Sequence, residues 1–146
     1  MGENIVIDTA TSLDVVEDKK RVGMASFEAW LLAKPQVDIP LSHYFADGIY
    51  GRAMMLAAGV AFTGRVHKLR HLCILAQGTM VLTSTTSEPE EITAPHIFVA
   101  PPNTKRAGYA VTDCVFINVL PTNETDVETI ENEFTSLDYV NLIGVQ

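Results

Sequence analysis

The sequence has few cysteines, no long apolar run and no secretory signal pattern. It contains only two cysteines, Cys73 and Cys114, and a single tryptophan among its 146 residues. No apolar run approaches the roughly 20 residues that a transmembrane helix needs. The first residues are acidic where a secretory signal would be basic and then apolar. We therefore expect a cytoplasmic protein with no membrane partner and with both cysteines as free thiols.

Basic residues are scarce and unevenly placed. The chain has 10 Lys and Arg against 18 Asp and Glu, for a formal net charge of −8. No Lys or Arg follows Arg106, whereas half of all basic residues lie between Arg65 and Arg106. Proteins that grip phosphate backbones have a strongly basic face, so we do not expect a nucleic-acid partner.

Length and composition predict one globular domain with three segments. A chain of 146 residues that is 47% hydrophobic can build one core. Residues 1–36 are expected to form an N-terminal arm and a short helix. Residues 37–121 consist of short strand-like runs separated by turn residues, which predicts seven or eight strands in an all-β sandwich or barrel. Residues 122–146 are expected to form an acidic helix and an apolar tail.

The two helices are predicted from apolar spacing. Ser26 precedes apolar residues at helical spacing as far as Ala33, and Pro35 ends the helix, which leaves about two turns. The residues before it are predicted to be an arm with one short edge strand. The C-terminal helix is expected to be capped near Asn123 or Thr125. Its buried face would consist of Val127, Ile130, Phe134 and Leu137.

The last residues, YVNLIGVQ, leave four large apolar side chains at the end of the chain. Chain ends fray unless something covers them. Two alternatives stay open: the tail mediates self-association, or it packs on the same domain.

Two histidines stand four apart in GRVHKLRHLCILAQG, and Gly78 follows His71 by seven residues at a tight strand connection. This spacing resembles the first motif of the cupin family. That motif has two histidines separated by one residue, then a glutamate, then a glycine seven residues further on. His67 matches the second histidine, His71 stands at the place of the glutamate, and Arg65 stands at the place of the first histidine.

The second cupin motif, a proline followed by glycine and then histidine, resembles FVAPPNTKRAGY. Pro101 and Pro102 match, Asn103 replaces the glycine, and Arg106 replaces the histidine ligand. Asn, like Gly, tolerates the left-handed backbone conformation that such a turn requires.

More closely, residues 37 to 131 resemble a set of cupin-like proteins encoded by tailed bacteriophages. The resemblance implies an all-β, cupin-type jelly-roll β-barrel with a short N-terminal helix and a C-terminal acidic helix. It also implies a phage context, with the protein in the host cytoplasm or the virion, and association into homo-oligomers through barrel strands. It implies no settled reaction.

His67 and His71 are candidate ligands for one divalent transition metal, such as Zn, Fe, Ni or Mn. Three or four ligands are typical, so others must contribute. Cys73 follows His71 by two residues and so faces the same side of a strand, and His96 could also point inward. The alternative is that no metal binds, the histidines hydrogen-bond within a polar barrel mouth, Cys73 is ordinary core and His96 lies at the surface.

Arginine at two ligand positions suggests a different site. Guanidinium groups bind carboxylate or phosphate through paired hydrogen bonds, so Arg65, Arg70 and Arg106 are candidate contacts for a small anionic ligand. Tyr109 could add a hydroxyl. The alternative is that these arginines are solvated or pair with acidic residues, and that Tyr109 is a half-buried packing residue.

Two functions from different classes follow. One is a cupin-like binding protein with a metal or a small anionic ligand at the barrel mouth, with catalysis left open. The other is a virion structural or assembly component, which uses the barrel as an oligomerising scaffold and contacts other phage structural proteins. A pocket with several convergent functional groups would favour the first.

Overall fold

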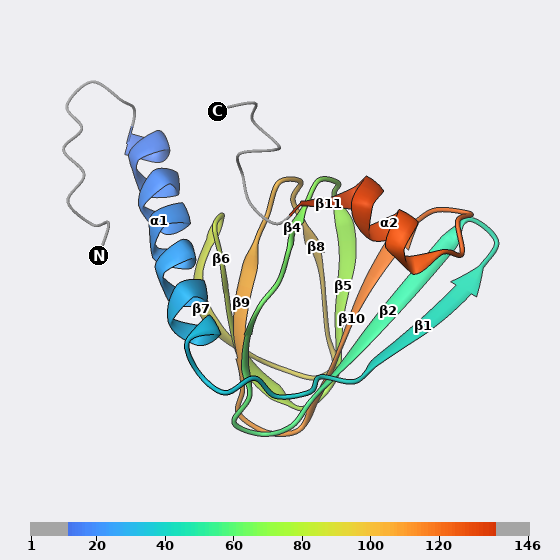
Figure 1. Ribbon diagram of the computed structural model, residues 1–146, viewed down its shortest axis with the longest axis horizontal. Coiled ribbons are helices and arrows are strands. Elements are labelled where there is room, and N and C mark those ends of the chain that lie inside the picture. Colours follow the sequence, from blue (N-terminus) through green and yellow to red (C-terminus); the bar gives the residue numbers. More distant parts are fainter. Residues whose placement is uncertain (1–11, 137–146) are drawn as a thin grey trace.

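The computed structural model describes residues 12–136. They form two helices and eleven strands (Figure 1). In chain order these are α1 (Ser12–Leu32), β1 (Leu41–Ala46), β2 (Ile49–Leu56), β3 (Ala61–Thr63), β4 (Val66–His67), β5 (His71–Gln77), β6 (Thr79–Ser84), β7 (Ser87–Thr93), β8 (His96–Ala100), β9 (Arg106–Ala110), β10 (Cys114–Pro121), α2 (Val127–Phe134) and β11 (Thr135–Ser136).

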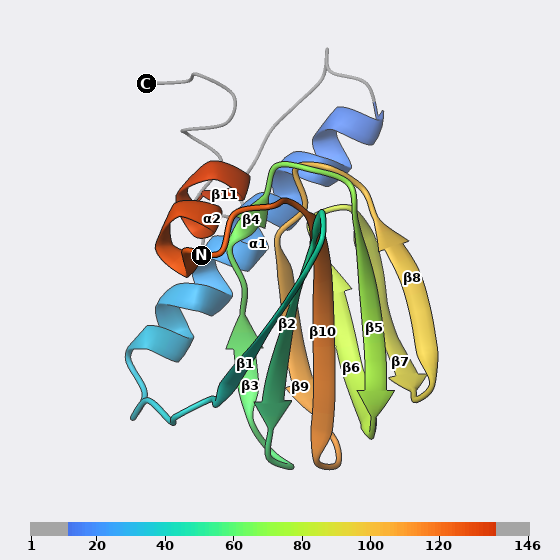
Figure 2. The same ribbon diagram turned by 90° about the vertical axis from the view of Figure 1, so that its right-hand side faces the viewer.

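The strands form two larger antiparallel sheets that face each other (Figures 1 and 2). The five-stranded sheet has the order β1-β2-β10-β5-β8, and the four-stranded sheet has the order β3-β9-β6-β7. A third, short sheet joins β11 to β4. The larger sheets are not hydrogen-bonded to each other at their edges, so a closed barrel is not confirmed. The arrangement is consistent with a jelly roll.

The strand number differs from the prediction of seven or eight. Ten strands lie between Leu41 and Pro121. One reason is the run VAFTGRVH, which the sequence presents as a single strand. Its first part, β3, pairs with β9, and its second part, β4, pairs with β11. The chain changes partner at Gly64 and Arg65, which divides the run.

Helix α1 corrects the prediction for the N-terminal segment. It spans 21 residues from Ser12, instead of about two turns from Ser26, so residues 12–25 are helical and do not form an arm. The rest of the predicted arm, residues 1–11, lies outside the described residues. The run EDKKR, taken as part of an arm, consists largely of good helix formers. Glu28 fastens α1 to the four-stranded sheet, because its two carboxylate oxygens lie 2.7 Å from Lys105 Nζ and 2.7 Å from Thr63 Oγ1.

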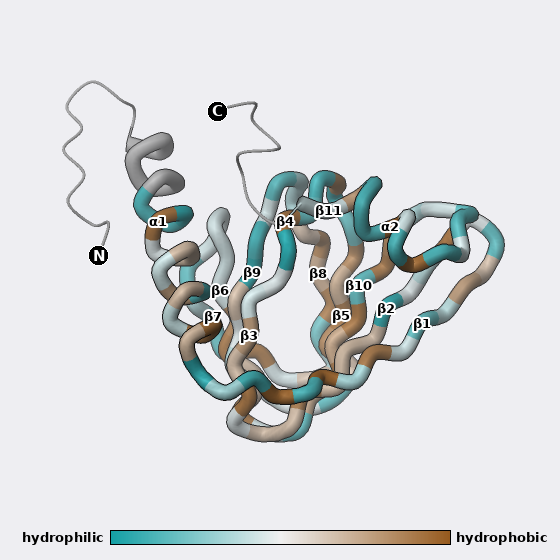
Figure 3. The backbone as a smooth tube through the Cα atoms, viewed as in Figure 1, coloured by the Kyte–Doolittle hydropathy of each residue, from teal (hydrophilic) through white to brown (hydrophobic). Residues whose placement is uncertain are grey.

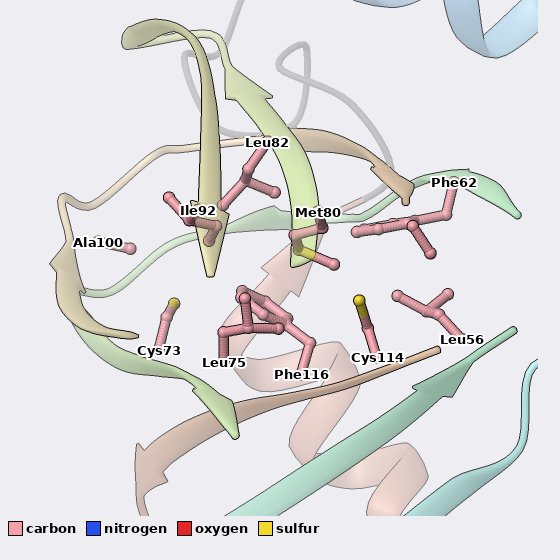
Figure 4. Close-up of a cluster of buried hydrophobic side chains, with 11 residues drawn as sticks. Leu56, Phe62, Cys73, Leu75, Met80, Leu82, Ile92, Ala100, Cys114 and Phe116 are labelled. Carbon is pink, nitrogen blue, oxygen red and sulfur yellow. The ribbon is translucent and has the colours of Figure 1, made fainter. Parts of the chain in front are cut away.

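The core lies between the two larger sheets. Alternate residues of each strand point inward, as a half-buried strand requires. Figure 4 shows these side chains reaching toward one another from both sheets. The cluster consists of Leu56, Phe62, Cys73, Leu75, Met80, Leu82, Ile92, Ala100, Ala110, Cys114 and Phe116. Both cysteines are buried and free.

Helix α2 closes one end of the sandwich. It begins at Val127 with Asp126 as its cap, not Asn123 or Thr125, because the Asp126 side chain accepts a hydrogen bond from the Thr129 backbone N–H at 3.0 Å. Strand β11 replaces the helix directly after Phe134. Residue 137, residues 1–11 and the apolar tail lie outside the described residues.

Two of the four residues predicted for the buried face of α2 are buried, and Val127 is half-buried. Ile130 and Phe134 pack with Tyr50 and Leu120 of the five-stranded sheet. In Figure 3, hydrophilic segments gather at this same end, near β4, β9 and α2. The polar side chains of the candidate site come from this region.

Candidate functional site

The two motif segments meet in space through backbone hydrogen bonds. The N–H of His67 donates to the carbonyl of Thr104 at 3.0 Å, and the N–H of Asn103 donates to the carbonyl of His67 at 2.7 Å. Asn103 has a φ of 60°, so it adopts the left-handed conformation predicted for it. This pairing brings Arg106, the first residue of β9, close to the histidines.

Arg106 is a buried cation at the centre of the site. Its exposed fraction is 6%. Nη2 donates to His71 Nε2 at 2.9 Å and to Asn118 Oδ1 at 3.3 Å. The guanidinium carbon lies 6.0 Å and 5.9 Å from the ring centres of Phe98 and Phe116. The two ring centres are themselves 6.3 Å apart, so the guanidinium lies to one side of this aromatic pair and close to both rings.

The second terminal nitrogen of Arg106 has no partner. Within the described residues, Nη1 is the one buried side-chain nitrogen or oxygen without a hydrogen bond. No described carboxylate pairs with this guanidinium. Burial lowers the pKa of Arg106, and the nearby Cys73 opposes that shift. A buried charge without a counter-ion is costly, so the site favours an incoming anion.

His67 and His71 form a stacked pair. Their ring centres are 4.4 Å apart and their planes differ by 24°. Nδ1 of His67 lies 3.2 Å from the carbonyl of Arg65, and Nδ1 of His71 lies 3.0 Å from the carbonyl of Leu69. A carbonyl only accepts, so each Nδ1 carries the proton and each Nε2 is an acceptor.

Both histidines are neutral at neutral pH. Burial is the main cause that lowers the pKa of His67 to about 3, and neighbouring His71 and Arg106 lower it further. Burial also lowers the pKa of His71 to about 4, with Arg106 acting in the same direction. The positive charge of the site therefore comes from arginine.

A cavity of about 240 Å³ opens beside Arg106. It lies among β1, β2, β3 and β10. Its polar lining consists mainly of Arg52, Arg65, His67, Arg106 and Asn118. Its apolar lining consists of Ile39, Leu41, Met54, Phe62 and Phe116. Three guanidinium groups thus line one cavity.

No protein-family model matches this sequence, and no curated protein matches it. Solved structures do. KdgF from Halomonas sp. is 15% identical, with a TM-score of 0.52 over 64% of this chain and 88% of its own. An RmlC-like cupin family protein from Methanocaldococcus jannaschii is 16% identical, with a TM-score of 0.50 over 62% and 85%. A cupin superfamily protein from Desulfitobacterium hafniense is 13% identical, with a TM-score of 0.50 over 64% and 85%.

The chain has a cupin fold. At such low identity the likeness shows the fold and leaves the activity open. No helix among the described residues is long and apolar enough to cross a membrane.

The cupin sheet explains why Arg52 belongs to the site although it was not among the predicted residues. In the register of the five-stranded sheet, Asn118 of β10 lies opposite Arg52 of β2 on one side and Cys73 of β5 on the other. The signal was present in the alternation of β2, where Arg52 shares the inward face with Tyr50 and Leu56.

Arg65 lines the cavity and also contacts the C-terminal helix region. Its Nε donates to Thr135 Oγ1 at 2.6 Å and lies 3.9 Å from Glu131 Oε2. Strand β11 carries Thr135 and pairs with His67. The end of α2 therefore positions Arg65 at this cavity of the cupin fold.

The structure does not bring Arg70 or Tyr109 to this cavity. Arg70 is exposed in the turn before β5. Tyr109 is 47% exposed, because Arg106, Gly108 and Ala110 occupy the inward positions of β9 and Tyr109 points the other way.

Cys73 and His96 are also separate from the cavity lining. Cys73 is fully buried, and its thiol donates to Asn118 Oδ1 at 3.3 Å. Burial raises the pKa of this thiol, which keeps it protonated. His96 lines a second cavity of about 290 Å³ beside β7 and β8, which Arg106 also lines and which contains Glu88 and Glu90. The ring centre of His96 lies 5.7 Å from that of Phe98.

The donor set does not fit a resident metal. Residues 12–136 contain no group of three or more His, Cys, Asp or Glu side chains that could hold a metal ion. The Nε2 lone pair of His71, which a metal would need, accepts a hydrogen bond from Arg106. A guanidinium cannot coordinate a cation and repels it at this distance.

Proposed function

We propose that this protein binds a small anionic ligand in the cavity lined by Arg52, Arg65 and Arg106. The observation that carries the proposal is the buried guanidinium of Arg106, whose Nη1 has no hydrogen-bond partner. An anion in the cavity would supply the missing counter-charge to this guanidinium.

The charged side chains of the cavity lining all favour an anion. Three guanidinium groups line it, and no Asp or Glu does. His67 also lines it, and its Nε2 makes no hydrogen bond within the described residues. That nitrogen can accept a hydrogen bond from a ligand hydroxyl. The site thus offers donors to a charged group and one acceptor beside it.

Binding fits the chemistry better than catalysis. A general base works best when its pKa lies near the working pH, whereas the pKa of His67 is about 3. The thiol of Cys73 is buried and protonated, so it is a poor nucleophile. The proposal therefore includes no reaction.

The test compares anion-dependent stabilisation of matched arginine variants. Thermal unfolding of the wild-type protein should shift upward in acetate or inorganic phosphate, because a ligand of the folded state stabilises it. Arg106→Gln should weaken this effect at least tenfold in ligand concentration. Arg52→Gln and Arg65→Gln test the same cavity without altering a fully buried group, and exposed Arg70→Gln is the control. Equal responses in all four variants would overturn the proposal.

A second measurement, of metal content, tests whether the histidine pair holds a metal instead. We expect mass spectrometry of the untagged protein to find much less than one equivalent of Zn, Fe, Ni or Mn. Near-stoichiometric metal that is lost in the folded His67→Ala/His71→Ala variant would show that the histidine pair holds a metal. It would contradict the conclusion that these side chains do not fit one.

We also propose that the protein forms a homo-oligomer through the outer face of its five-stranded sheet. The exposed apolar side chains on this face are Tyr44, Ile49, Leu72, Ile97 and Val99. Figure 2 shows the face toward the viewer, with neither helix across it. No outward position of these strands carries Asp, Glu, Lys or Arg. Because the chain carries a net charge of −8, an uncharged face suits contact with a second copy.

A phage role is the second candidate function. The likeness of residues 37–131 to phage-encoded cupin-like proteins supports a protein made in the host cytoplasm, and oligomer formation would suit a virion or assembly component. Mass spectrometry of purified virions tests this alternative. Stoichiometric copies in virions would support it, and absence from virions would leave the binding role.

A further inference from the structure

We infer that the ligand is a small monocarboxylate with an apolar body, such as a short fatty acid or an aryl carboxylate. The inference rests on the proposed anion-binding function and names the chemical class that the cavity selects. It is drawn from three features of the cavity: the order of its lining, the position of its charges and its size.

The lining is divided into a charged row and an apolar row. In the five-stranded sheet, Arg52 and Asn118 lie opposite each other on β2 and β10. Two residues further along the same strands, Met54 lies opposite Phe116 and also opposite Leu41 of β1. Two residues of a strand span about 7 Å. A ligand can therefore place its charge on the first row and an apolar body on the second.

The charges favour one negative group and no positive group. Arg106 is the only fully buried arginine of the lining, whereas Arg52 and Arg65 are half-buried. One anionic group compensates the one desolvated charge. A ligand ammonium would find no carboxylate in the lining. Zwitterions such as amino acids, which carry that ammonium, are therefore disfavoured.

The size and the apolar wall argue against inorganic phosphate as the preferred ligand. The cavity volume of about 240 Å³ lies just below the range of drug-sized sites. It is still much larger than a small oxyanion, which would leave Met54, Phe62 and Phe116 in contact with water or empty space. An apolar body of a few carbons fills this space, and the planar guanidinium fork matches a carboxylate.

The experiment is a calorimetric titration of the whole 146-residue chain with a matched ligand series: acetate, butanoate, hexanoate, hexan-1-ol, norleucine and inorganic phosphate. Affinity should rise about fourfold per added methylene from acetate to hexanoate, because each buried methylene contributes about 0.8 kcal/mol. Hexan-1-ol, which lacks the charge, and norleucine, which adds an ammonium, should each bind at least tenfold more weakly than hexanoate.

A pair of leucine variants tests whether the apolar row of the cavity, and not any exposed leucine of this sheet, contacts the ligand. Leu41→Gln should weaken hexanoate binding more than acetate binding, and so reduce the chain-length dependence. Leu72→Gln is the control, because Leu41 and Leu72 are 40% and 38% exposed on strands of the same sheet, and Leu72 lies on its outer face. The control should bind hexanoate as the wild type does.

The titration distinguishes failure of the monocarboxylate class from failure of anion binding itself. If acetate and phosphate bind through Arg106 but affinity does not rise with chain length, the monocarboxylate class is wrong and the anion site stands. If norleucine binds as tightly as hexanoate, the class is likewise wrong. If no anion binds to the wild-type protein, both proposals fall.

Discussion

Arginine at two positions where the cupin motifs carry histidine changes the chemistry of the site at the scale of single residues. A histidine there would present a neutral nitrogen to a cation. Arg65 and Arg106 instead present hydrogen-bond donors and positive charge. The buried histidines adapt by staying neutral, and His71 accepts a hydrogen bond from Arg106. The residues that resemble a metal centre therefore present positive charge in place of metal ligands, which supports the proposed anion site.

The neutral histidine pair predicts a loss of stability in mild acid. The pKa values of His67 and His71 in the folded protein are about 3 and about 4, below the ordinary value of 6.5. As pH falls below about 6.5, the unfolded chain binds protons that the folded protein does not, so the free energy of unfolding decreases. By about pH 5 we expect a loss of roughly 2 kcal/mol per histidine.

Urea unfolding of wild type and His67→Gln between about pH 7.5 and about pH 5 measures this effect. The variant should lose about half of the pH dependence. His96→Gln, outside the stacked pair, should keep all of it. An unchanged pH dependence in His67→Gln would show that this imidazole does not supply the effect.

At the scale of elements, the connection between β5 and β6 depends on Gly78. Its φ is +89°, a region that residues with a side chain rarely adopt. A Cβ at this position would also overlap the backbone oxygen of Asp113 and the side chains of Cys114 and Thr112. The motif glycine is thus required both by the turn and by the close approach of the loop before β10.

Gly78→Ala and Gly48→Ala separate these two requirements. Gly48 has a φ of +75° but open space around its Cβ position. We expect Gly48→Ala to lower the free energy of unfolding by about 1–2 kcal/mol from backbone strain alone. Gly78→Ala should lower the free energy of unfolding by roughly 2 kcal/mol more than Gly48→Ala, because its Cβ overlaps neighbouring atoms, or it should prevent folding. Equal losses by urea unfolding would show that the close approach does not matter.

At the scale of the whole molecule, the two faces of the five-stranded sheet carry different chemistry. The inner face holds the core and the candidate site. The outer face is apolar and carries no charged side chain at the outward positions of its strands. Leu72 lies opposite Val99, and Ile74 lies opposite Ile97, so apolar residues of β5 and β8 adjoin. Large contiguous apolar patches on a soluble protein mark interaction sites.

Sedimentation at micromolar protein concentration tests self-association through this face. The wild-type protein should sediment as a dimer or a higher symmetric oligomer. Ile97→Glu should produce a monomer, because like charges would face each other across the interface. Val111→Glu is the control, since Val111 is 43% exposed in the β9–β10 turn. A monomeric wild type would contradict the proposal.

The sequence by itself determined the local features of this protein. Alternation identified a β-rich domain, and spacing identified Ile130 and Phe134 as the buried face of α2. The turns at Gly78 and Asn103 were predicted from the resemblance to the cupin motifs together with residue type. These features depend on neighbours a few residues away. The same local view missed the early start of α1 at Ser12, because a charged helix face and a charged arm have similar compositions.

Only the tertiary structure decided which residues form the site. Arg52, Arg65 and Arg106 are far apart along the chain and meet through strand register and sheet stacking. Register is set by the whole hydrophobic pattern, and a shift of one residue would turn Arg52 to the outer face. The sequence also could not predict that Arg106 Nη1 lacks a hydrogen-bond partner. That absence depends on every group packed around the guanidinium.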